Sequence, residues 1–306
     1  MHKAKQFFFA GVLSVQERRT AYEPKKSLKE LNLLDKFLFD EAMDDPENVK
    51  TMLDIILSQN TNLKHPPQTE KEQRTSTDNR QIWLDVYAID EDDVIYEVEA
   101  QKENTHNLPK RSRLYQGIID SKLLPPGVVD FNLLNEVLIV LIMPFDLFGY
   151  GLYRYTFQMK CEEVPELKLD DGATRIFLNT RGKHPELVSP ELIELLKYME
   201  HSTDEVSEAC ESKRIQEMHR RVCQIRASEK TEVKYMQTWE EQIMIKQEGI
   251  TEGRIEGEKI GRLRGKRELL EKLSDKFSIE QISEMLEIDV SELKNIMKEI
   301  QNEKYL

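Results

Sequence analysis

The chain has 306 residues, of which 33% are charged and 8% are aromatic, and its net charge is −13. This length is sufficient to bury a hydrophobic core in one or two domains. The negative net charge excludes a generally basic, histone-like nucleic-acid binder, although it allows a local basic patch, because binding depends on the charge near the site.

The cysteines and the apolar runs predict the compartment. Cys161, Cys210 and Cys223 are an odd number of cysteines without metal-like spacing, and we interpret them as reduced thiols. An apolar run from Phe7 to Val15 is at the short limit for a signal peptide and lacks a clear small-residue cleavage site. No run reaches the roughly 18 apolar residues that span a membrane. We therefore expect a soluble, cytoplasmic protein that does not enter a membrane.

The first strong pattern in the sequence is helical. Apolar residues at helical spacing predict one helix over 28–43, which ends at Asp45-Pro46 because proline suits the first turn of a following helix. That second helix is predicted over 46–60. The polar segment 59–78 contains a proline pair and predicts an exposed loop.

The hydrophobic period then changes from 3.6 to two. This change predicts strands over 80–89 and 93–101, joined by an acidic turn at 90–93. A helix is predicted over 108–124, because Pro109 stands at its start and a Pro-Pro-Gly sequence follows it.

The rest of the chain completes a sheet and then becomes helical. The continuous apolar run 135–145 predicts a strand that is buried on both faces, and 152–164 and 173–180 are two further strand candidates. From Ser189 onward the pattern is almost wholly helical. The order of elements predicts a central mixed sheet with helices packed on it.

Polar side chains interrupt one face of the strand at 93–101. Glu97, Glu99 and Gln101 share this face because residues two apart in a strand point the same way. Pairing with the preceding strand would bring Asp85 near Glu99. Two close carboxylates repel each other, and a divalent cation such as Mg²⁺ relieves the repulsion. The alternative is that this face is simply solvated, as half-exposed strands often are.

The helix at 108–124 follows this strand closely and is locally basic. Residues 102–125 contain five Lys or Arg against two acidic residues, a local charge of +3. Arg111 and Tyr115 are four apart and share a helix face, while Lys110 and Arg113 are three apart. Such a face can hold a phosphate backbone. The alternatives are a solvated helix face and, for Tyr115, a core position with only its hydroxyl in the site.

Together these features resemble a known family. Asp85, the Glu-Ala-Gln triplet 99–101 and the basic helix 108–124 resemble the core pattern of the PD-(D/E)XK nuclease superfamily. Within it, the chain is similar to the Rpn-type family of recombination-promoting nucleases and transposases over roughly 28–200. The resemblance implies an α/β fold: a restriction-endonuclease-like core of a central mixed β-sheet flanked by helices, followed by an all-helical C-terminal region.

The resemblance also implies roles for single residues. Asp85 and Glu99 match the two metal-binding carboxylates of the superfamily. Gln101 stands where most members carry a lysine; glutamine can hydrogen-bond the attacking water but supplies no charge. The Rpn-type family shares this glutamine. Glu41 is a candidate accessory carboxylate from the first helix, and Glu97 is interpreted as an accessory or exposed residue rather than a ligand.

The function that the resemblance implies is metal-dependent hydrolysis of DNA phosphodiester bonds. Asp85 and Glu99 would hold Mg²⁺ or Mn²⁺, Gln101 would position water, and a group of side chains on the basic helix would contact DNA: Lys110, Arg111, Arg113 and Tyr115. The family name links this activity to DNA recombination or mobile elements. The alternative is a non-catalytic nucleic-acid-binding or scaffold protein that kept the fold, which Gln101 and the acidic net charge favour.

Glycine recurs at every fourth position in the C-terminal third, at 249, 253, 257, 261 and 265. Interior glycines weaken a helix by about 1 kcal/mol each against alanine. They become useful if a second helix packs against them, which would favour a homodimer through this region. The alternative is a flexible charged linker.

Residues 278–300 have the pattern of a helix–turn–helix. Ile279, Ile282 and Leu286 form the apolar stripe of the first helix, and Asp289 and Glu292 stand in capping-box positions of the second. The acidic residues in and beside the second helix favour a packing or oligomerisation module over a DNA-reading one. We predict four segments. They are an N-terminal segment without a strong pattern (1–27), a nuclease-like domain (28–200), a charged helical region with the glycine repeat (201–270) and the helix–turn–helix-like module (271–306).

Overall fold

The computed structural model describes residues 26–73, 82–274, 276–291 and 293–294. The described residues form two compact units, one that ends at Tyr235 and one that begins at Met236. Among the described helices, none is long and apolar enough to cross a membrane.

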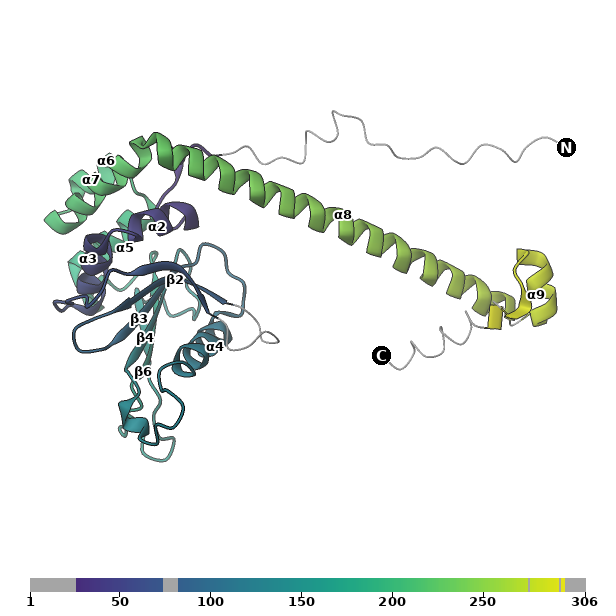
Figure 1. The fold of residues 1–306 in the computed structure, drawn as a ribbon, viewed down its shortest axis with the longest axis horizontal. Helices are drawn as coiled ribbons and strands as arrows, with labels where there is room; N and C mark the ends of the chain where they lie inside the picture. Colours follow the sequence, from purple (N-terminus) through teal and green to yellow (C-terminus); the bar gives the residue numbers. More distant parts are fainter. Residues whose placement is uncertain (1–25, 74–81, 275, 292, 295–306) are drawn as a thin grey trace. The chain divides into compact units, whose positions relative to one another are not determined.

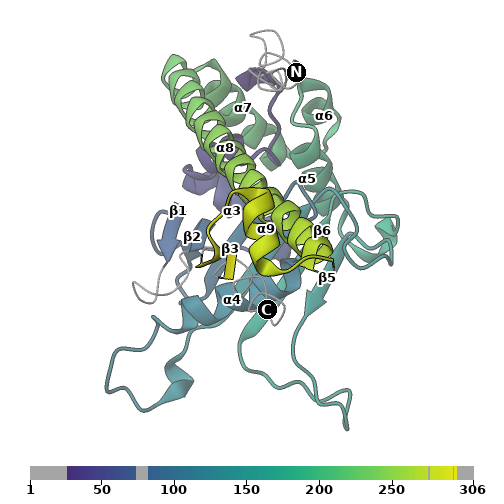
Figure 2. The ribbon, with the colours of Figure 1, turned by 90° about the vertical axis from the view of Figure 1, so that its right-hand side faces the viewer.

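A six-stranded mixed sheet lies at the centre of the first unit (Figure 2). Its strand order is β1-β2-β3-β4-β6-β5. The strands β3, β4 and β6 are mutually parallel, and the pairs β1–β2, β2–β3 and β6–β5 are antiparallel. The strands are β1 (Gln68–Gln73), β2 (Ile82–Ile89), β3 (Ile95–Ala100), β4 (Val137–Met143), β5 (Arg154–Phe157) and β6 (Ala173–Asn179). The predicted mixed sheet flanked by helices is therefore confirmed.

Helices cover both faces of this sheet (Figure 1). One face carries a layer that includes α2, α3, α5 and α7, and the other face carries α4. The helices are α2 (Lys36–Met43), α3 (Pro46–Leu57), α4 (Leu108–Asp120), α5 (Pro190–Glu200), α6 (Asp204–Ala209), α7 (Lys213–Ala227), α8 (Glu229–Ser274) and α9 (Ile279–Leu286), with short 3-10 helices η1 (Leu28–Glu30), η2 (Phe131–Leu133) and η3 (Pro185–Leu187).

The strand β4 shows why its sequence is a continuous apolar run. Val140 and Ile142 belong to the core under α2, α3, α5 and α7, whereas Ile139 and Leu141 belong to the core under α4. Successive side chains of a strand point to opposite faces, so a strand with a core on each side must be apolar at every position. The prediction of a doubly buried strand over 135–145 is confirmed.

The predicted helix over 28–43 is too long. Leu28 opens the 3-10 helix η1, and the α-helix begins only at Lys36. Leu31 and Leu34, which set the helical spacing in the sequence, are buried although they lie outside regular helix. The following boundary is as predicted, because Asp45 caps α3 by accepting a hydrogen bond from the backbone N–H of Glu47.

The loop predicted over 59–78 contains a strand, and this part of the prediction is wrong. Residues 68–73 form β1, which pairs with β2 from Gln68 opposite Tyr87 to Gln73 opposite Ile82. Backbone hydrogen bonds to β2 define this edge strand, and its polar sequence gives no alternating pattern from which to predict it. Residues 74–78 lie outside the described part of the chain.

The two central strands and the helix after them match the prediction closely. The turn between β2 and β3 is held by Asp90, whose carboxylate accepts hydrogen bonds from the N–H groups of Asp92 and Val94. The helix α4 spans Leu108–Asp120, four residues shorter at its end than the predicted 108–124. The edge strand β5 is short, at 154–157 within the predicted 152–164.

The C-terminal part is helical, as predicted. The glycine repeat lies within α8, which is a continuous helix of 46 residues. In the second unit, Ile282 of α9 is buried against Leu270 and Leu293. The predicted second helix begins at Val290, and the predicted cap Asp289 accepts a hydrogen bond from the N–H of Ser291. Glu292 and the residues after Lys294 lie outside the described part of the chain. The helices α6 and α7, which follow the predicted boundary at residue 200, belong to the first compact unit.

Candidate functional site

A cavity of about 690 Å³ opens at the end of β3, beside the first turns of α2 and α4. Four basic and four acidic side chains are among the residues that line it: Lys36, Lys102, Lys110, Arg111, Asp35, Asp85, Glu99 and Glu103. The other lining residues are Leu34, Ala100, Gln101, Asn107, Leu114 and Tyr115. Every lining residue thus comes from residues 34–115 of the first unit.

The hairpin register brings the predicted carboxylates together. Val86 of β2 pairs with Val98 of β3, and Tyr87 pairs with Glu97, so the antiparallel ladder leads Asp85 toward Glu99. Asp85 and Glu99 both line the cavity, and these two residues are 7% and 8% exposed. The alternative of a solvated hairpin face is wrong, because α4 packs over this face.

Glu97 is more buried than the sequence suggested. It is 0% exposed, which corrects its interpretation as an exposed residue. Its neighbours across the sheet are Tyr87 on β2 and Ile139 on β4, both part of the core under α4. Neither of its carboxylate oxygens accepts a hydrogen bond from any described residue. Burying an ionised carboxylate without partners costs free energy, so Glu97 favours its neutral, protonated form or a nearby positive charge.

Burial and mutual repulsion shift the titration of these carboxyls. Burial, followed by the charges of Glu99 and Asp85, raises the pKa of Glu97 well above its usual value. Burial also raises the pKa of Glu99 to about 7; Asp85 contributes to this rise, while Arg111 and Lys36 oppose it. One oxygen of Glu99, Oε2, accepts no hydrogen bond from the described residues. Burial therefore disfavours negative charge on these carboxyls, and their basic neighbours neutralise it only in part.

Two basic side chains provide that partial neutralisation. The Arg111 guanidinium of α4 donates through Nη2 to Glu99 Oε1 and to Gln101 Oε1. The Lys36 ammonium of α2 donates to Asp85 Oδ1 at 2.8 Å and to Asp40 Oδ2 at 2.9 Å. Although burial lowers the pKa of Lys36, these two carboxylates raise it above its ordinary value. Lys36 is therefore charged at neutral pH.

Gln101 lies directly after β3, within this network. Its side-chain carbonyl accepts from Arg111, and its Nε2 donates to the backbone carbonyl of Glu103 at 2.6 Å. The amide is thus oriented by the loop between β3 and α4. It can exchange hydrogen bonds with water but adds no charge to the cavity.

The remaining predicted residues are placed differently. Lys110 lines the cavity, whereas Arg113 is exposed on α4 and is not a lining residue. Tyr115 lines the cavity and is 8% exposed within the core under α4, which favours its core role. Burial and then Glu99 raise its pKa. Glu41 lies outside the cavity lining, and its carboxylate pairs with Lys234.

Lys36 and Asp40 were missed by the sequence analysis. Lys36 lies 49 residues before Asp85, and its only local signal is the four-residue spacing to Asp40. Such spacing is usual for surface ion pairs on helices. Only the packing of α2 against the sheet shows that this lysine belongs to the site.

The donor atoms fit a hard divalent cation. Carboxylate oxygens are the ligands that Mg²⁺ and Mn²⁺ prefer, and the cavity offers them from Asp85 and Glu99, while Glu97 is buried outside the cavity lining. The buried oxygens of Glu97 and Glu99 Oε2, which accept no hydrogen bond within the described part of the chain, provide unsatisfied acceptors. A cation would lower the cost of keeping them ionised.

Comparison with known proteins gives no family for the chain: no family model, curated protein or solved structure matches it.

Proposed function

We propose that this protein is a metal-dependent endonuclease that hydrolyses phosphodiester bonds in DNA, built on a restriction-endonuclease-like core. The observation that carries the proposal is the convergence of two buried carboxylates, Asp85 and Glu99, with two basic side chains, Lys36 and Arg111, at one open cavity. Glu97, on the same strand as Glu99, is a third buried carboxyl outside the cavity lining.

The residues divide into metal ligands and phosphate partners. Asp85 and Glu99 would hold Mg²⁺ or Mn²⁺, with Glu97 behind them as a further acidic group. A bound cation of this kind lowers the pKa of a water molecule and stabilises charge on a phosphate under attack. Lys110 lines the cavity and would contact the DNA backbone. Gln101, oriented by Arg111, would hydrogen-bond the attacking water.

Lys36 supplies the positive charge that Gln101 lacks. Its ammonium lies 2.8 Å from Asp85 Oδ1, at the carboxylate that would bind the cation. With a cation bound to Asp85, the Lys36 ammonium would be available to a phosphate oxygen and would stabilise the negative charge that develops there. We expect Lys36→Gln to lower the rate of DNA cleavage about 10²–10³-fold. The matched control is Lys29→Gln, at an exposed lysine of η1 outside the cavity lining.

Cleavage of supercoiled plasmid tests the proposal directly. The purified protein is incubated with Mg²⁺, Mn²⁺ or EDTA, alongside Asp85→Asn and Glu99→Gln. Glu91→Gln is the matched control, because Glu91 lies in the β2–β3 turn of the same hairpin but is exposed. We expect nicking that requires metal, is lost in Asp85→Asn and Glu99→Gln, and persists in Glu91→Gln. Cleavage that is unchanged in Asp85→Asn would contradict the assignment of the site.

A second candidate function is a nucleic-acid-binding or scaffold protein without catalysis. The observation that favours it is that Lys36 and Arg111 already neutralise Asp85 and Glu99 in part, so the carboxylates have internal partners. Under this alternative, the wild-type chain binds labelled DNA but does not cut it in the presence of Mg²⁺ or Mn²⁺. The same binding assay with Lys110→Ala would then identify the surface.

A further inference from the structure

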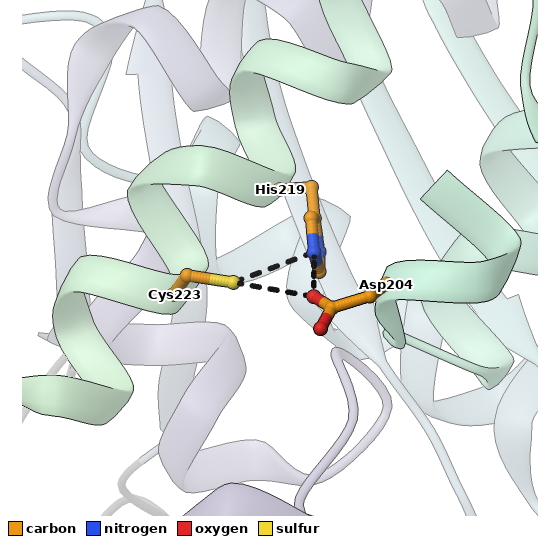
Figure 3. A group of neighbouring side chains, drawn as sticks. All are labelled: Asp204, His219 and Cys223. Atoms are coloured by element: carbon orange, nitrogen blue, oxygen red, sulfur yellow. Dashed lines mark hydrogen bonds and ion pairs between the residues drawn. The ribbon is translucent and has the colours of Figure 1, made fainter. Parts of the chain in front are cut away.

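A second cluster of reactive side chains lies in the helical layer of the first unit, outside the cavity described above. It consists of Asp204, His219 and Cys223, which point toward one another (Figure 3). His219 and Cys223 are four residues apart on α7 and therefore share a helix face. Asp204 is the first residue of the six-residue helix α6.

The three donor atoms converge on one point. His219 Nε2 lies 2.7 Å from Asp204 Oδ1 and 3.4 Å from Cys223 Sγ, and Sγ lies 3.9 Å from Oδ1. In a nucleophilic triad, by contrast, the acid and the nucleophile contact opposite nitrogens of the imidazole. Here the acid and the thiol both face Nε2, so the geometry disfavours a Cys–His–Asp nucleophile.

The other ring nitrogen has its own buried partner. His219 Nδ1 lies 3.0 Å from the hydroxyl of Tyr198, which is fully buried in the core under the helical layer. His219 itself is 7% exposed. A hydroxyl both donates and accepts, so Tyr198 can support either tautomer of the imidazole. Metal-binding histidines usually have such an outer partner, which fixes the ring and directs the free nitrogen toward the ion.

We propose that Asp204, His219 and Cys223 bind a divalent transition metal of the zinc class. Thiolate, imidazole and carboxylate are the ligand types that Zn²⁺ takes, whereas Mg²⁺ prefers oxygen alone. Zinc bound tetrahedrally at about 2.0 Å to N or O and 2.3 Å to S holds its ligand atoms about 3.3–3.6 Å apart. The observed separations of 2.7, 3.4 and 3.9 Å bracket this range.

Only the short Asp204–His219 contact must open to admit the ion. The side chain of Asp204 is 80% exposed, so it can move outward without disturbing the core. The same exposure leaves the fourth coordination position to water. The ion would join the start of α6 to the middle of α7, which stabilises α6 because a six-residue helix is weak on its own.

The sequence by itself does not bring these three ligands together. His219 and Cys223 are spaced to lie one turn apart on α7, but the third ligand, Asp204, comes from a different helix, α6. The three cysteines lack a metal-like spacing among themselves. The candidate ligands beside Cys223 are His219 on the same helix and Asp204 on α6.

Cobalt spectroscopy of the purified full-length chain tests the proposal, because Co²⁺ replaces Zn²⁺ and a thiolate ligand produces a charge-transfer band in the near ultraviolet. We expect that band in the wild type, with an intensity that corresponds to one thiolate-bound cobalt per chain, and its loss when Zn²⁺ is added. Cys223→Ser removes the band, and Asp204→Asn weakens cobalt binding. Cys161→Ser is the matched control, since Cys161 is a free cysteine whose thiol contacts Glu163 instead.

Two further measurements separate metal binding from a folding defect. Zn²⁺ should raise the thermal unfolding midpoint of the wild type and of Cys161→Ser more than that of Cys223→Ser, with all three matching in circular dichroism without metal. Tyr198→Phe should keep the charge-transfer band while lowering cobalt affinity about 10–100-fold, as loss of an outer partner does. Absence of the band in the wild type, or a band that persists in Cys223→Ser, would overturn the proposal.

Discussion

At the scale of single residues, Glu97 is the carboxyl near the candidate site whose burial has the clearest consequence for stability. It is fully buried, and its oxygens accept no hydrogen bond from the described residues. A carboxyl whose pKa is raised on folding stabilises the fold below its unfolded pKa. That stabilisation is lost as the pH rises through the folded pKa. Glu97 therefore costs the fold free energy at neutral and alkaline pH when no cation is bound.

We expect Glu97→Gln to raise the free energy of unfolding at pH 8 by about 1–3 kcal/mol, because the amide cannot ionise. At pH 5 the difference should be small, since Glu97 is then protonated and similar in shape to glutamine. Urea unfolding in EDTA at both pH values measures this, with Glu103→Gln as the exposed control. A variant less stable than wild type at pH 8 would show that the carboxylate has a stabilising partner.

The pKa of Glu99 predicts a pH dependence of metal binding. Burial first, and then Asp85, raise this pKa to about 7, so at pH 6 most of the carboxyl is protonated and must release its proton to bind a cation. We expect the affinity for Mn²⁺ to rise about tenfold between pH 6 and pH 8. Titration calorimetry measures this. Glu99→Gln should bind weakly at both pH values, and an equally steep dependence in this variant would assign the titration to another group.

At the scale of elements, the question for the glycine repeat of α8 is whether a second helix packs against it or whether it forms an open helix face. A Cβ atom added at any of the five glycines would have no described atom within 4 Å beyond the helix backbone. Alanine should therefore be accommodated, and it is the better helix former by about 1 kcal/mol per site. Within the described part of one chain, no second helix covers the stripe.

We expect alanine at all five positions to raise the thermal stability of α8, monitored by circular dichroism at the helical minimum. The positions are 249, 253, 257, 261 and 265. Light scattering on the same samples reports the oligomeric state. If the substitutions instead lower the stability or dissociate a dimer, the glycines contact a second copy of the chain, and the stripe is an interface.

At the scale of the whole molecule, the first unit contains every residue of both candidate sites. The cavity is lined by residues 34–115, and the proposed zinc-class site by residues of α6 and α7. The start of α8 still belongs to this unit: the ring of Tyr235 lies 4.9 Å from that of Phe37, and its hydroxyl donates to the Lys26 carbonyl. Phe37 follows Lys36 directly in α2, so Tyr235 packs against the helix that carries the lysine of the cavity.

We therefore expect a chain that ends after Glu240 to keep the unfolding transition of the first unit and any metal-dependent cleavage. A chain that ends after Ala227 loses the Tyr235 contacts and the Lys234–Glu41 pair. It should lose about 3–5 kcal/mol of stability, as removal of a buried aromatic side chain does. Calorimetry of the two truncated chains measures the difference. Equal stability would show that α8 does not contribute to the first unit.

The sequence alone determined the features that depend on neighbouring residues. The alternation at 93–101, the apolar run of β4 and the Asp45-Pro46 boundary follow from strand and helix periodicity and from capping. These signals located Asp85 and Glu99 on adjacent strands. They could not locate β1, whose polar residues are held by pairing with β2, or the break between η1 and α2.

Only the tertiary structure decided which face is buried and which distant residues meet. The alternation put Glu97 and Glu99 on one face, but α4, packing over that face, made Glu97 a buried carboxyl rather than a solvated one. Lys36 reaches Asp85 from 49 residues away, and Asp204 meets His219 across the α6–α7 corner. Periodicity reports the direction of a side chain relative to its own backbone. What that side chain meets depends on how separate elements pack, and therefore on the whole fold.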